Sequence, residues 1–101
     1  MPKGYWIIRI DVHDLEGFKA YAAAAAGPLA RHGARFIVRG GSFENPEGEH
    51  RARNIVLEFP SYQSALDCWH SPEYQELIGL RTPYSTIDLV IIDGYDGPQP
   101  S

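Results

Sequence analysis

The segment 69–81, WHSPEYQELIGLR, holds the densest group of chemically capable side chains in the sequence. Tyr74 and Arg81 are seven residues apart, which is two turns of a helix, so both can line one groove. A phenol beside a guanidinium can hold a carboxylate or a phenolate, because arginine offers a planar fork of hydrogen-bond donors. We therefore predict a ligand-binding site in which Arg81 anchors an anion and Trp69 and Tyr74 supply the walls.

The same segment can also be explained by helix packing alone. Ser71, Pro72 and Glu73 are typical of a helix start, as N-cap, first helical residue and acidic first turn. Trp69 would complete the apolar stripe of a preceding helix, and Arg81 would lie where a cation stabilises a helix C-terminus. Both interpretations remain open from the sequence, and they differ in whether Arg81 contacts a ligand.

Four charged residues on the expected strands present a second choice. They project to one side of the sheet if side chains alternate regularly, and they are Arg9, Arg39, Glu58 and Asp88. Arg9 would then reach Glu58 or Asp88. The four charges form either an ion-pair network in a subunit interface or a polar cavity with paired acid and base groups. We take Arg39 as a second anion-binding candidate beside Arg81.

Two residues are candidates for catalytic proton transfer, His32 and Glu58. His32 ends a helix one residue before Gly33, where a histidinium also suits the helix dipole without any catalysis. Desolvation would raise the pKa of Glu58, and an arginine partner would lower it. No set of His, Cys and carboxylate residues has metal-ligand spacing, and His70 lacks a partner at helical spacing. We therefore expect no bound metal and no cofactor.

The elements that must position these residues follow a βαββαβ order. Strands are expected at about 4–12, 34–40, 54–59 and 85–93, where β-branched and aromatic residues concentrate. Right-handed crossovers of this order give a ferredoxin-like α+β fold, with a four-stranded antiparallel sheet and both helical regions on one face. Residues 1–94 would form this single domain, and residues 95–101 a flexible C-terminal tail.

The helix boundaries are marked by capping and breaking residues. Asp14 is expected to cap the first helix and Ser61 the second, because short polar side chains satisfy the free N–H groups of a first turn. Gly33 is expected to end the first helix. Pro28 lacks an N–H group, so we predict that this helix kinks or restarts there.

Strand alternation predicts what lies on each face of the sheet. The face expected to meet the helices is wholly apolar, with Trp6, Ile8, Ile10, Val12, Phe36, Val38, Ile55, Leu57, Phe59, Ile87, Leu89 and Ile91. The opposite face is mixed, and its apolar members are Ile7, Ile37, Val56, Val90 and Ile92. A solvated sheet face is normally more polar than this, so we expect a second subunit to cover it and the protein to be a homodimer.

Composition excludes several classes of function. The 101-residue chain has a net charge of −4 and no basic run, which argues against a surface that tracks nucleic-acid phosphates. No apolar stretch approaches the roughly 20 residues of a membrane-spanning helix, and the N-terminus is too mixed for a signal peptide. Cys68 is the single cysteine and forms no internal disulfide, which suits a reducing compartment. We expect a cytoplasmic protein that binds neither nucleic acid nor membrane.

Longer stretches of the sequence resemble a known family. The stretches are KGYWIIRIDVHD, ARFIVRGGSFE, RNIVLEFPSYQSALDCWHSPEYQELIGLR and DLVIIDG, which together span residues 3 to about 94. They resemble the family called domain of unknown function 1330, which implies a ferredoxin-like fold in the dimeric α-β barrel superfamily. The resemblance implies no established reaction, although the superfamily includes small monooxygenases that degrade haem or oxidise polyketides without a separate flavin. The Asn, Trp and His set of the haem-degrading members has no counterpart that we can place here.

These observations together predict a small homodimer that binds an acidic or aromatic metabolite between the sheet and the second helical region. Two alternatives remain open. One is a non-catalytic dimer that binds or organises a partner, and the other is an enzyme similar to the cofactor-independent monooxygenases.

Overall fold

In the computed structural model, which describes residues 2–101, the chain forms a four-stranded sheet and three α-helices. The elements in order are β1 (Gly4–Val12), α1 (Leu15–Arg31), β2 (Arg35–Arg39), β3 (Arg53–Phe59), α2 (Tyr62–His70), α3 (Pro72–Arg81), the 3-10 helix η1 (Thr82–Tyr84) and β4 (Ser85–Asp93). The strands pair antiparallel in the order β2-β3-β1-β4. The predicted α+β fold class and element order are confirmed.

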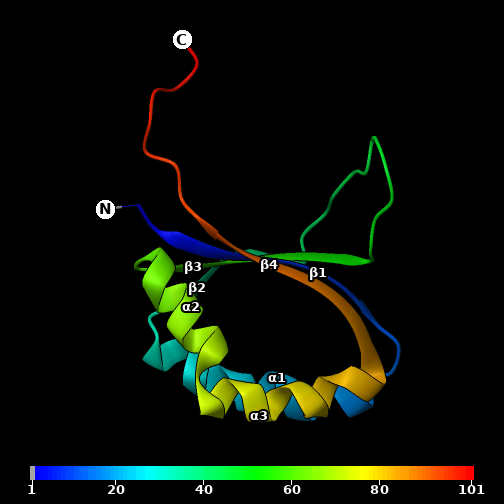
Figure 1. Ribbon diagram of the computed structural model, residues 1–101. Helices are drawn as coiled ribbons and strands as arrows, with labels where there is room; N and C mark the ends of the chain where they lie inside the picture. Colours follow the sequence, from blue (N-terminus) through cyan, green and yellow to red (C-terminus); the bar gives the residue numbers. More distant parts are fainter. Residues whose placement is uncertain (1) are drawn as a thin grey trace.

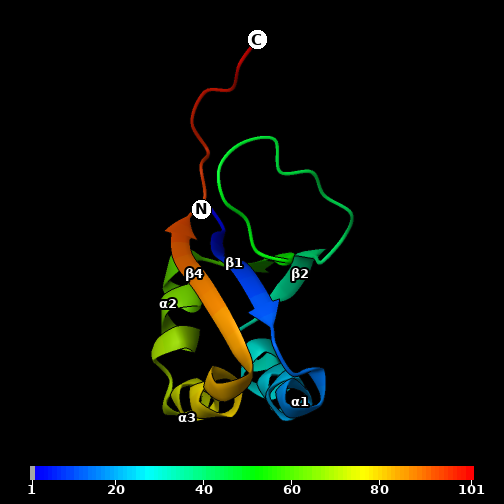
Figure 2. The same ribbon diagram turned by 90° about the vertical axis from the view of Figure 1, so that its right-hand side faces the viewer.

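All three helices lie on one side of the sheet, and two irregular segments extend from the other side (Figure 1). These segments are the loop 40–52 and the tail 94–101, and both also rise away from the helices in the perpendicular view (Figure 2). α2 packs on the strands β1, β3 and β4, whereas α1 packs mainly against α3. Among residues 2–101, no helix combines the length and apolar character needed to cross a membrane.

Three capping side chains set the helix starts. Asp14, Ser61 and Ser71 each accept a hydrogen bond from the backbone N–H three residues further on, at 3.1, 3.0 and 3.1 Å. The predicted caps are therefore confirmed, including the cap inside the segment 69–81. Gly17 in the first turn of α1 permits a close approach of the Tyr84 ring, because any Cβ at this position would collide with it.

α1 runs without a break through Pro28 to Arg31, so the predicted restart at Pro28 is wrong. Proline removes only one donor from the helix, and here the ring is buried against the protein. The carbonyl of Pro28 still accepts a hydrogen bond from the N–H of His32 at 3.2 Å, which carries the helix to its end. Gly33 stops the helix as predicted, with a left-handed φ of 77°.

Aromatic side chains fill the core beneath α2. Trp6 is 1% exposed, and its indole N–H donates to the carbonyl of Ala65 at 3.0 Å. Its ring centroid lies 5.0 Å from that of Tyr74 and 5.1 Å from that of Phe59. Cys68 is buried in the same cluster, and burial raises the pKa of its thiol to about 11. This cysteine is therefore a packing residue rather than a nucleophile.

The predicted alternation of faces fails in β2 because this strand contains a bulge. Val38 lies opposite Val56 and Arg39 opposite Ile55, with Ile37 as an extra residue in the ladder. Val38 therefore lies on the open face, whereas Arg39 faces the helices. Both placements reverse the prediction, since regular alternation carries no signal of an inserted residue.

Candidate functional site

A cavity of about 260 Å³ separates the sheet from the layer formed by α1 and α3. Its apolar lining consists of Ile8, Ile10, Phe18, Ala22, Ala25, Ala26, Leu29, Phe36, Ile55, Leu57, Ile87 and Leu89. Its polar lining consists of Tyr21, Arg39, Arg53, Tyr74 and Arg81. A mostly apolar cavity with a few convergent polar groups is the usual form of a site for a small molecule.

The alanine run of α1 provides the space for this cavity. Ala22, Ala25 and Ala26 line its middle, and the larger side chains of Phe18 and Leu29 line it a turn before and a turn after. A methyl group reaches only a short way from the helix backbone, so these positions leave a gap below the sheet. The run of small residues therefore sets the depth of the cavity.

Arg81, the last residue of α3, places a buried charge in the cavity. It is 8% exposed, and its Nε has no hydrogen-bond partner among the described residues. Its guanidinium carbon lies 5.4 Å from the centroid of the Tyr21 ring, within the range of a cation–π contact. No carboxylate lines the cavity, and no ion pair within residues 2–101 involves Arg81. A buried cation in this state is costly unless an anion joins it.

Tyr21 of α1 and Tyr74 of α3 meet beside this guanidinium. Their hydroxyl oxygens are 2.6 Å apart, and Tyr74 is 1% exposed. Burial, and then the proximity of Tyr74, raises the pKa of Tyr21 above its usual value. Tyr21 therefore stays a neutral phenol at physiological pH. When Tyr74 donates to Tyr21, the hydroxyl proton of Tyr21 is available to a ligand.

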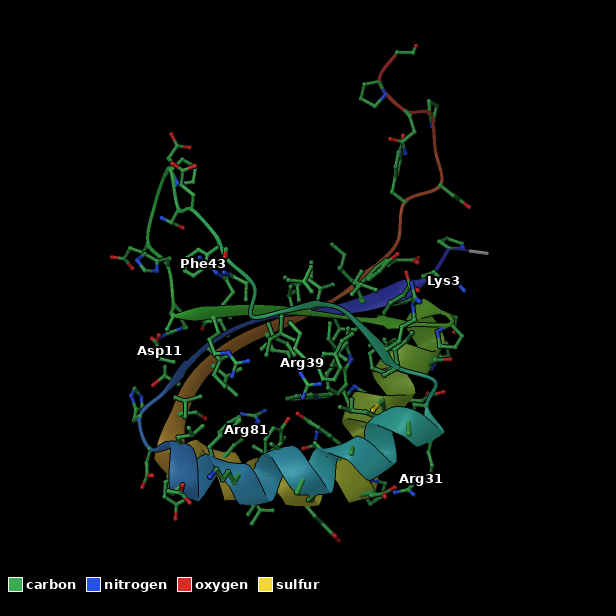
Figure 3. The ribbon with its side chains drawn as sticks, turned by 180° about the vertical axis from the view of Figure 1, so that it is seen from behind. Lys3, Asp11, Arg31, Arg39, Phe43 and Arg81 are labelled. Atoms are coloured by element: carbon green, nitrogen blue, oxygen red, sulfur yellow. The ribbon has the colours of Figure 1, made fainter. Side chains whose placement is uncertain are left out.

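Two further arginines reach the cavity from the sheet. Arg39 faces it because of the bulge in β2, and Figure 3 shows Arg39 and Arg81 directed into the same space between sheet and helices. The guanidinium carbon of Arg39 lies 4.0 Å from the centroid of the Phe36 ring. Arg53, at the start of β3, is exposed like Arg39, so both lie toward the solvent side. Neither forms an ion pair within the described part of the chain.

Three of the four predicted ligand-binding residues meet in this cavity, namely Arg39, Tyr74 and Arg81. Trp69 does not belong to the lining. Its ring packs edge-on against Trp6, with centroids 5.9 Å apart, and lies 5.5 Å from the ring of Tyr74. Trp69 therefore supports the wall of the cavity from behind instead of forming its surface.

The two candidates for proton transfer lie outside the cavity lining. His32 caps the end of α1, where its Nδ1 is 2.9 Å from the carbonyl oxygen of Pro28. Glu58 lies on the open face of the sheet and accepts hydrogen bonds from Arg35 at 3.0 Å and from the hydroxyl of Tyr5 at 3.2 Å. The structure therefore separates both residues from the predicted anion site.

Sequence reasoning missed two residues of the cavity, Tyr21 and Arg53. Tyr21 lies three residues after Phe18 and four before Ala25, so its helical spacing was an available signal. Arg53 lies two residues before Ile55 and shares its face of β3. Neither signal shows that the two residues approach one space, because that depends on how α1 is placed over the sheet.

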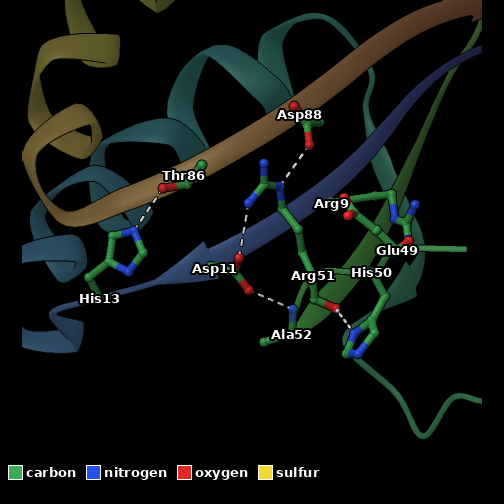
Figure 4. A network of polar contacts seen from close by, with 9 residues as sticks. All are labelled: Arg9, Asp11, His13, Glu49, His50, Arg51, Ala52, Thr86 and Asp88. Carbon is green, nitrogen blue, oxygen red and sulfur yellow. Dashed lines mark hydrogen bonds and ion pairs between the residues drawn. The ribbon is translucent and has the colours of Figure 1, made fainter. Parts of the chain in front are cut away.

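The open face of the sheet carries paired charges that hold the end of the loop 40–52 (Figure 4). Arg51 contacts the carboxylate of Asp88 at 2.7 Å and that of Asp11 at 3.0 Å. Asp11 also accepts a hydrogen bond from the backbone N–H of Ala52 at 2.7 Å. That bond, followed by the bond from Arg51, lowers the pKa of Asp11 below its usual value. These contacts are structural, because each charge already has a partner.

The predicted ion pair of Arg9 with Glu58 or Asp88 is wrong. Arg9 instead donates to the carbonyl oxygen of Glu49 at 3.3 Å. The reason is that the loop 40–52 returns over this end of the sheet and brings its own cation, Arg51, to Asp88. The described residues contain no group of three or more His, Cys, Asp or Glu side chains that could hold a metal ion.

Solved structures of other proteins are similar to this one over nearly its whole length. The RPA0582 protein of unknown function from Rhodopseudomonas palustris aligns with a TM-score of 0.70 at 15% identity, over 95% of this chain and 85% of that chain. SnoaB from Streptomyces nogalater, a cofactor-independent oxygenase, aligns with a TM-score of 0.61 at 14% identity, over 99% of this chain and 97% of that chain. At these identities the likeness shows a shared fold alone, the dimeric α-β barrel.

The family comparison agrees with the resemblance seen in the sequence. No curated protein matches the chain. The profile of the family described as Domain of unknown function (DUF1330) matches residues 3–95, a range that includes every strand and helix and every residue of the cavity. Because the match covers more than nine-tenths of the sequence, this chain belongs to the DUF1330 family.

Proposed function

We propose that the protein binds a small anionic ligand with an apolar or aromatic body in the cavity below the sheet. The observation that carries this proposal is Arg81, a guanidinium buried among apolar side chains with an unpartnered Nε. Arg39 lines the same cavity, and the Tyr21–Tyr74 pair offers a neutral hydrogen-bond donor beside Arg81. In this proposal Trp69 acts indirectly, by holding the ring of Tyr74 in place.

The energetics favour an anion over a neutral molecule. Removing an unpaired ion from water costs several kcal/mol even after the protein relaxes. A ligand carboxylate or phenolate offsets this cost, since a hydrogen bond to a charged group contributes about 1.5–3 kcal/mol. The apolar lining adds about 25 cal/mol for each Å² of apolar ligand surface that it covers. A neutral ligand gains the contribution from apolar burial but not the contribution from a hydrogen bond between opposite charges.

Phenylacetate and its neutral amide, phenylacetamide, provide a direct test. Both have the same apolar body, so isothermal titration should show that the acid binds and that the amide binds at least tenfold more weakly. Arg81→Met removes the positive charge at similar side-chain volume and should lower the affinity for phenylacetate by tenfold or more. His70→Ala, at the exposed end of α2, should change the affinity by less than threefold. Equal affinities for acid and amide would contradict the proposal.

A second test uses the shape of α1. Ala22→Leu places three extra carbon atoms in the cavity and should abolish phenylacetate binding, while the protein stays folded. Ala23→Leu adds the same atoms to the same helix at an exposed position that does not line the cavity, so it is a matched control. If both variants bind phenylacetate as the natural protein does, the ligand does not occupy this cavity.

We also propose that the protein is a homodimer whose subunits meet through the open face of the sheet. We propose the cytoplasm as its location. In support, Val90 is 50% exposed and Ile92 is 47% exposed on that face, beside the exposed Ile37 and Val38. The loop 40–52 and the tail 94–101 extend from the same side of the sheet, where they would contact a second subunit (Figure 1). The same apolar face would serve a non-catalytic dimer that binds or organises another partner.

A second candidate function is a cofactor-independent oxygenase. It is favoured by the fold shared with SnoaB and by the neutral Tyr21 beside Arg81, because these groups can stabilise a substrate anion that reacts with oxygen. One oxygen atom of O2 would enter the substrate as a carbonyl in place of CH2, and the other would leave as water. Oxygen uptake with an anthrone as the substrate tests this function. If the substrate binds but no oxygen is consumed, the oxygenase function is wrong and only the anion-binding function remains.

A further inference from the structure

We propose that the cavity selects ligands with two acidic groups joined by an apolar spacer, one group bound at Arg81 and the other at Arg39 and Arg53. This inference rests on the anion-binding function proposed above and specifies the chemical class of its ligand. It follows from how positive charge is distributed in the cavity, which has a buried cation at the helix layer and two exposed cations at the sheet.

The bulge in β2 is the first observation. If the strand had no bulge and Ile37 were paired like its neighbours, regular alternation would direct Arg39 to the open face and Val38 into the apolar cavity. The structure has the reverse arrangement, which directs a charged side chain toward an apolar cavity and exposes an apolar one on the open face. Such an exchange destabilises an isolated subunit, and bulges commonly redirect side chains near binding sites. A ligand group that needs a cation at this position explains the exchange.

The second observation is that Arg39 and Arg53 line the same cavity without a carboxylate beside them. Gly40 follows Arg39 directly, and a Cβ built on Gly40 would lie 2.9 Å from Nε of Arg53, so the Arg53 side chain runs along the end of β2. No acidic residue lines this part of the cavity within residues 2–101. Positive charges that line one cavity repel each other, and an anion bound there reduces this repulsion.

The stacking of Arg39 on Phe36 leaves the Arg39 donors available. A cation–π contact uses the flat face of a guanidinium, and here that contact measures 4.0 Å from the guanidinium carbon to the ring centroid. The N–H groups lie in the plane of the guanidinium and point outward from its edge. Phe36 therefore holds Arg39 in place and leaves its donors free to bind a ligand carboxylate.

Apart from its arginines and tyrosines, the cavity lining is apolar. The apolar lining includes Ile8, Ile10 and Ile55 from the sheet and Ala22 and Ala26 from α1. A compact dianion such as oxalate would leave these walls in contact with water. An alkyl or aromatic spacer covers them and keeps its two acids apart. The ligand class is therefore an apolar diacid instead of a phosphate-like ion.

Matched acids with the same carbon count test this inference. Isothermal titration compares suberate with octanoate, and the comparison is repeated for acids of six to ten carbons because the best spacing is set by the positions of the arginines. We expect at least one diacid to bind tenfold or more tightly than its matched monoacid. A double variant, Arg39→Gln with Arg53→Gln, should abolish this preference, so that each diacid binds no more tightly than its matched monoacid.

Arg35→Gln is the matched control. Arg35 lies on the same strand as Arg39 but pairs with Glu58 outside the cavity, so this variant removes one positive charge without touching the site. It should retain the preference for the diacid. Circular dichroism should show that all variants stay folded, since the substituted side chains are exposed.

The outcomes separate this inference from the function on which it rests. If every diacid binds no more tightly than its matched monoacid, the two-acid selection is wrong and anion binding stands. If the preference exists but survives loss of Arg39 and Arg53, the second acid binds elsewhere and the inference is again wrong. If neither series binds the natural protein, the anion-binding function and this inference fail together.

Discussion

The two faces of the sheet differ in whether their arginines have carboxylate partners. On the open face, Arg51 has two carboxylate partners, Asp11 and Asp88. On the face covered by the helices, Arg81 is more deeply buried and has no carboxylate partner within the described residues. The chain has thirteen acidic residues, yet none lines the cavity. The cavity therefore keeps its positive charge unneutralised.

This contrast separates structural charges from charges available to a ligand. An exposed ion pair contributes little to stability and also leaves little binding capacity, because its donors are already occupied. A buried cation that has no carboxylate partner and an unoccupied donor lowers the stability of the protein and raises its affinity for an anion. The same residue type therefore has a different role on each face. The four predictions below test this difference, from the largest expected effect to the smallest.

Ile37→Asp should convert a homodimer into monomers or insoluble protein. Burying each large apolar side chain of the open face contributes about 1.5–3 kcal/mol to dimer stability. An aspartate at position 37 removes that contribution and adds the cost of desolvating a charge. Light scattering measures the mass of the particles in solution. Ile37→Val should remain dimeric. A natural protein that is a stable monomer at micromolar concentration would show that the open face is exposed in solution.

Arg81→Met should raise the free energy of unfolding of the ligand-free protein by about 1–4 kcal/mol, because an apolar side chain replaces a buried charge that has no carboxylate partner. The comparison on the other face is Arg51→Met, which removes a paired cation and should lower stability slightly. Urea unfolding measures both variants. If both changes lower stability, Arg81 is satisfied within the protein and the two faces do not differ.

Tyr21→Phe should reduce the loss of stability at alkaline pH. The pKa of Tyr21 is raised in the folded protein above its usual value of 10.0, so the neutral phenol is favoured there and the unfolded chain ionises first. Its contribution to stability is therefore complete below pH 10 and decreases as pH rises above it. Urea unfolding at pH 8 and pH 11 should show a smaller difference for the variant. Tyr95→Phe, in the exposed tail, is the control.

Asp11→Asn should lower stability at neutral pH and have less effect in acid. The pKa of Asp11 is lowered from its usual value of 3.8, so its contribution is present above that pH and is lost as pH falls through the lowered value. Thermal unfolding of the natural protein and the variant at pH 7 and at pH 3 measures this difference. Asp96→Asn, in the exposed tail, should show no such dependence.

Much of the fold could be read from local signals. The caps at Asp14, Ser61 and Ser71 act within one helical turn, and strand alternation acts within a few residues, so the element order followed from short stretches. The errors arose where distant segments decide the outcome. The partner of Asp88 is Arg51, from a loop whose path no local pattern predicts.

The site was predictable to a smaller extent. The seven-residue spacing of Tyr74 and Arg81 correctly indicated that they share a space, because both lie on one helix. Arg39 was assigned to the wrong face, because the extra residue in β2 is a property of strand pairing. Trp69 was expected in the cavity lining, but its ring packs against Trp6 instead. Helix spacing alone could not predict this contact, because Trp6 lies on a distant strand.

The way α1 is attached to the rest of the protein has a consequence for motion. α1 packs mainly against α3 and spans the cavity, whereas α2 rests directly on the strands. Local opening of α1 should therefore cost less free energy than opening of α2, and its backbone amides should exchange with deuterated water sooner. A molecule held between Arg81 and the sheet would join α1 to the strands. Slower amide exchange along residues 18–29 would then report occupancy of the cavity, even for a ligand that causes no change of shape.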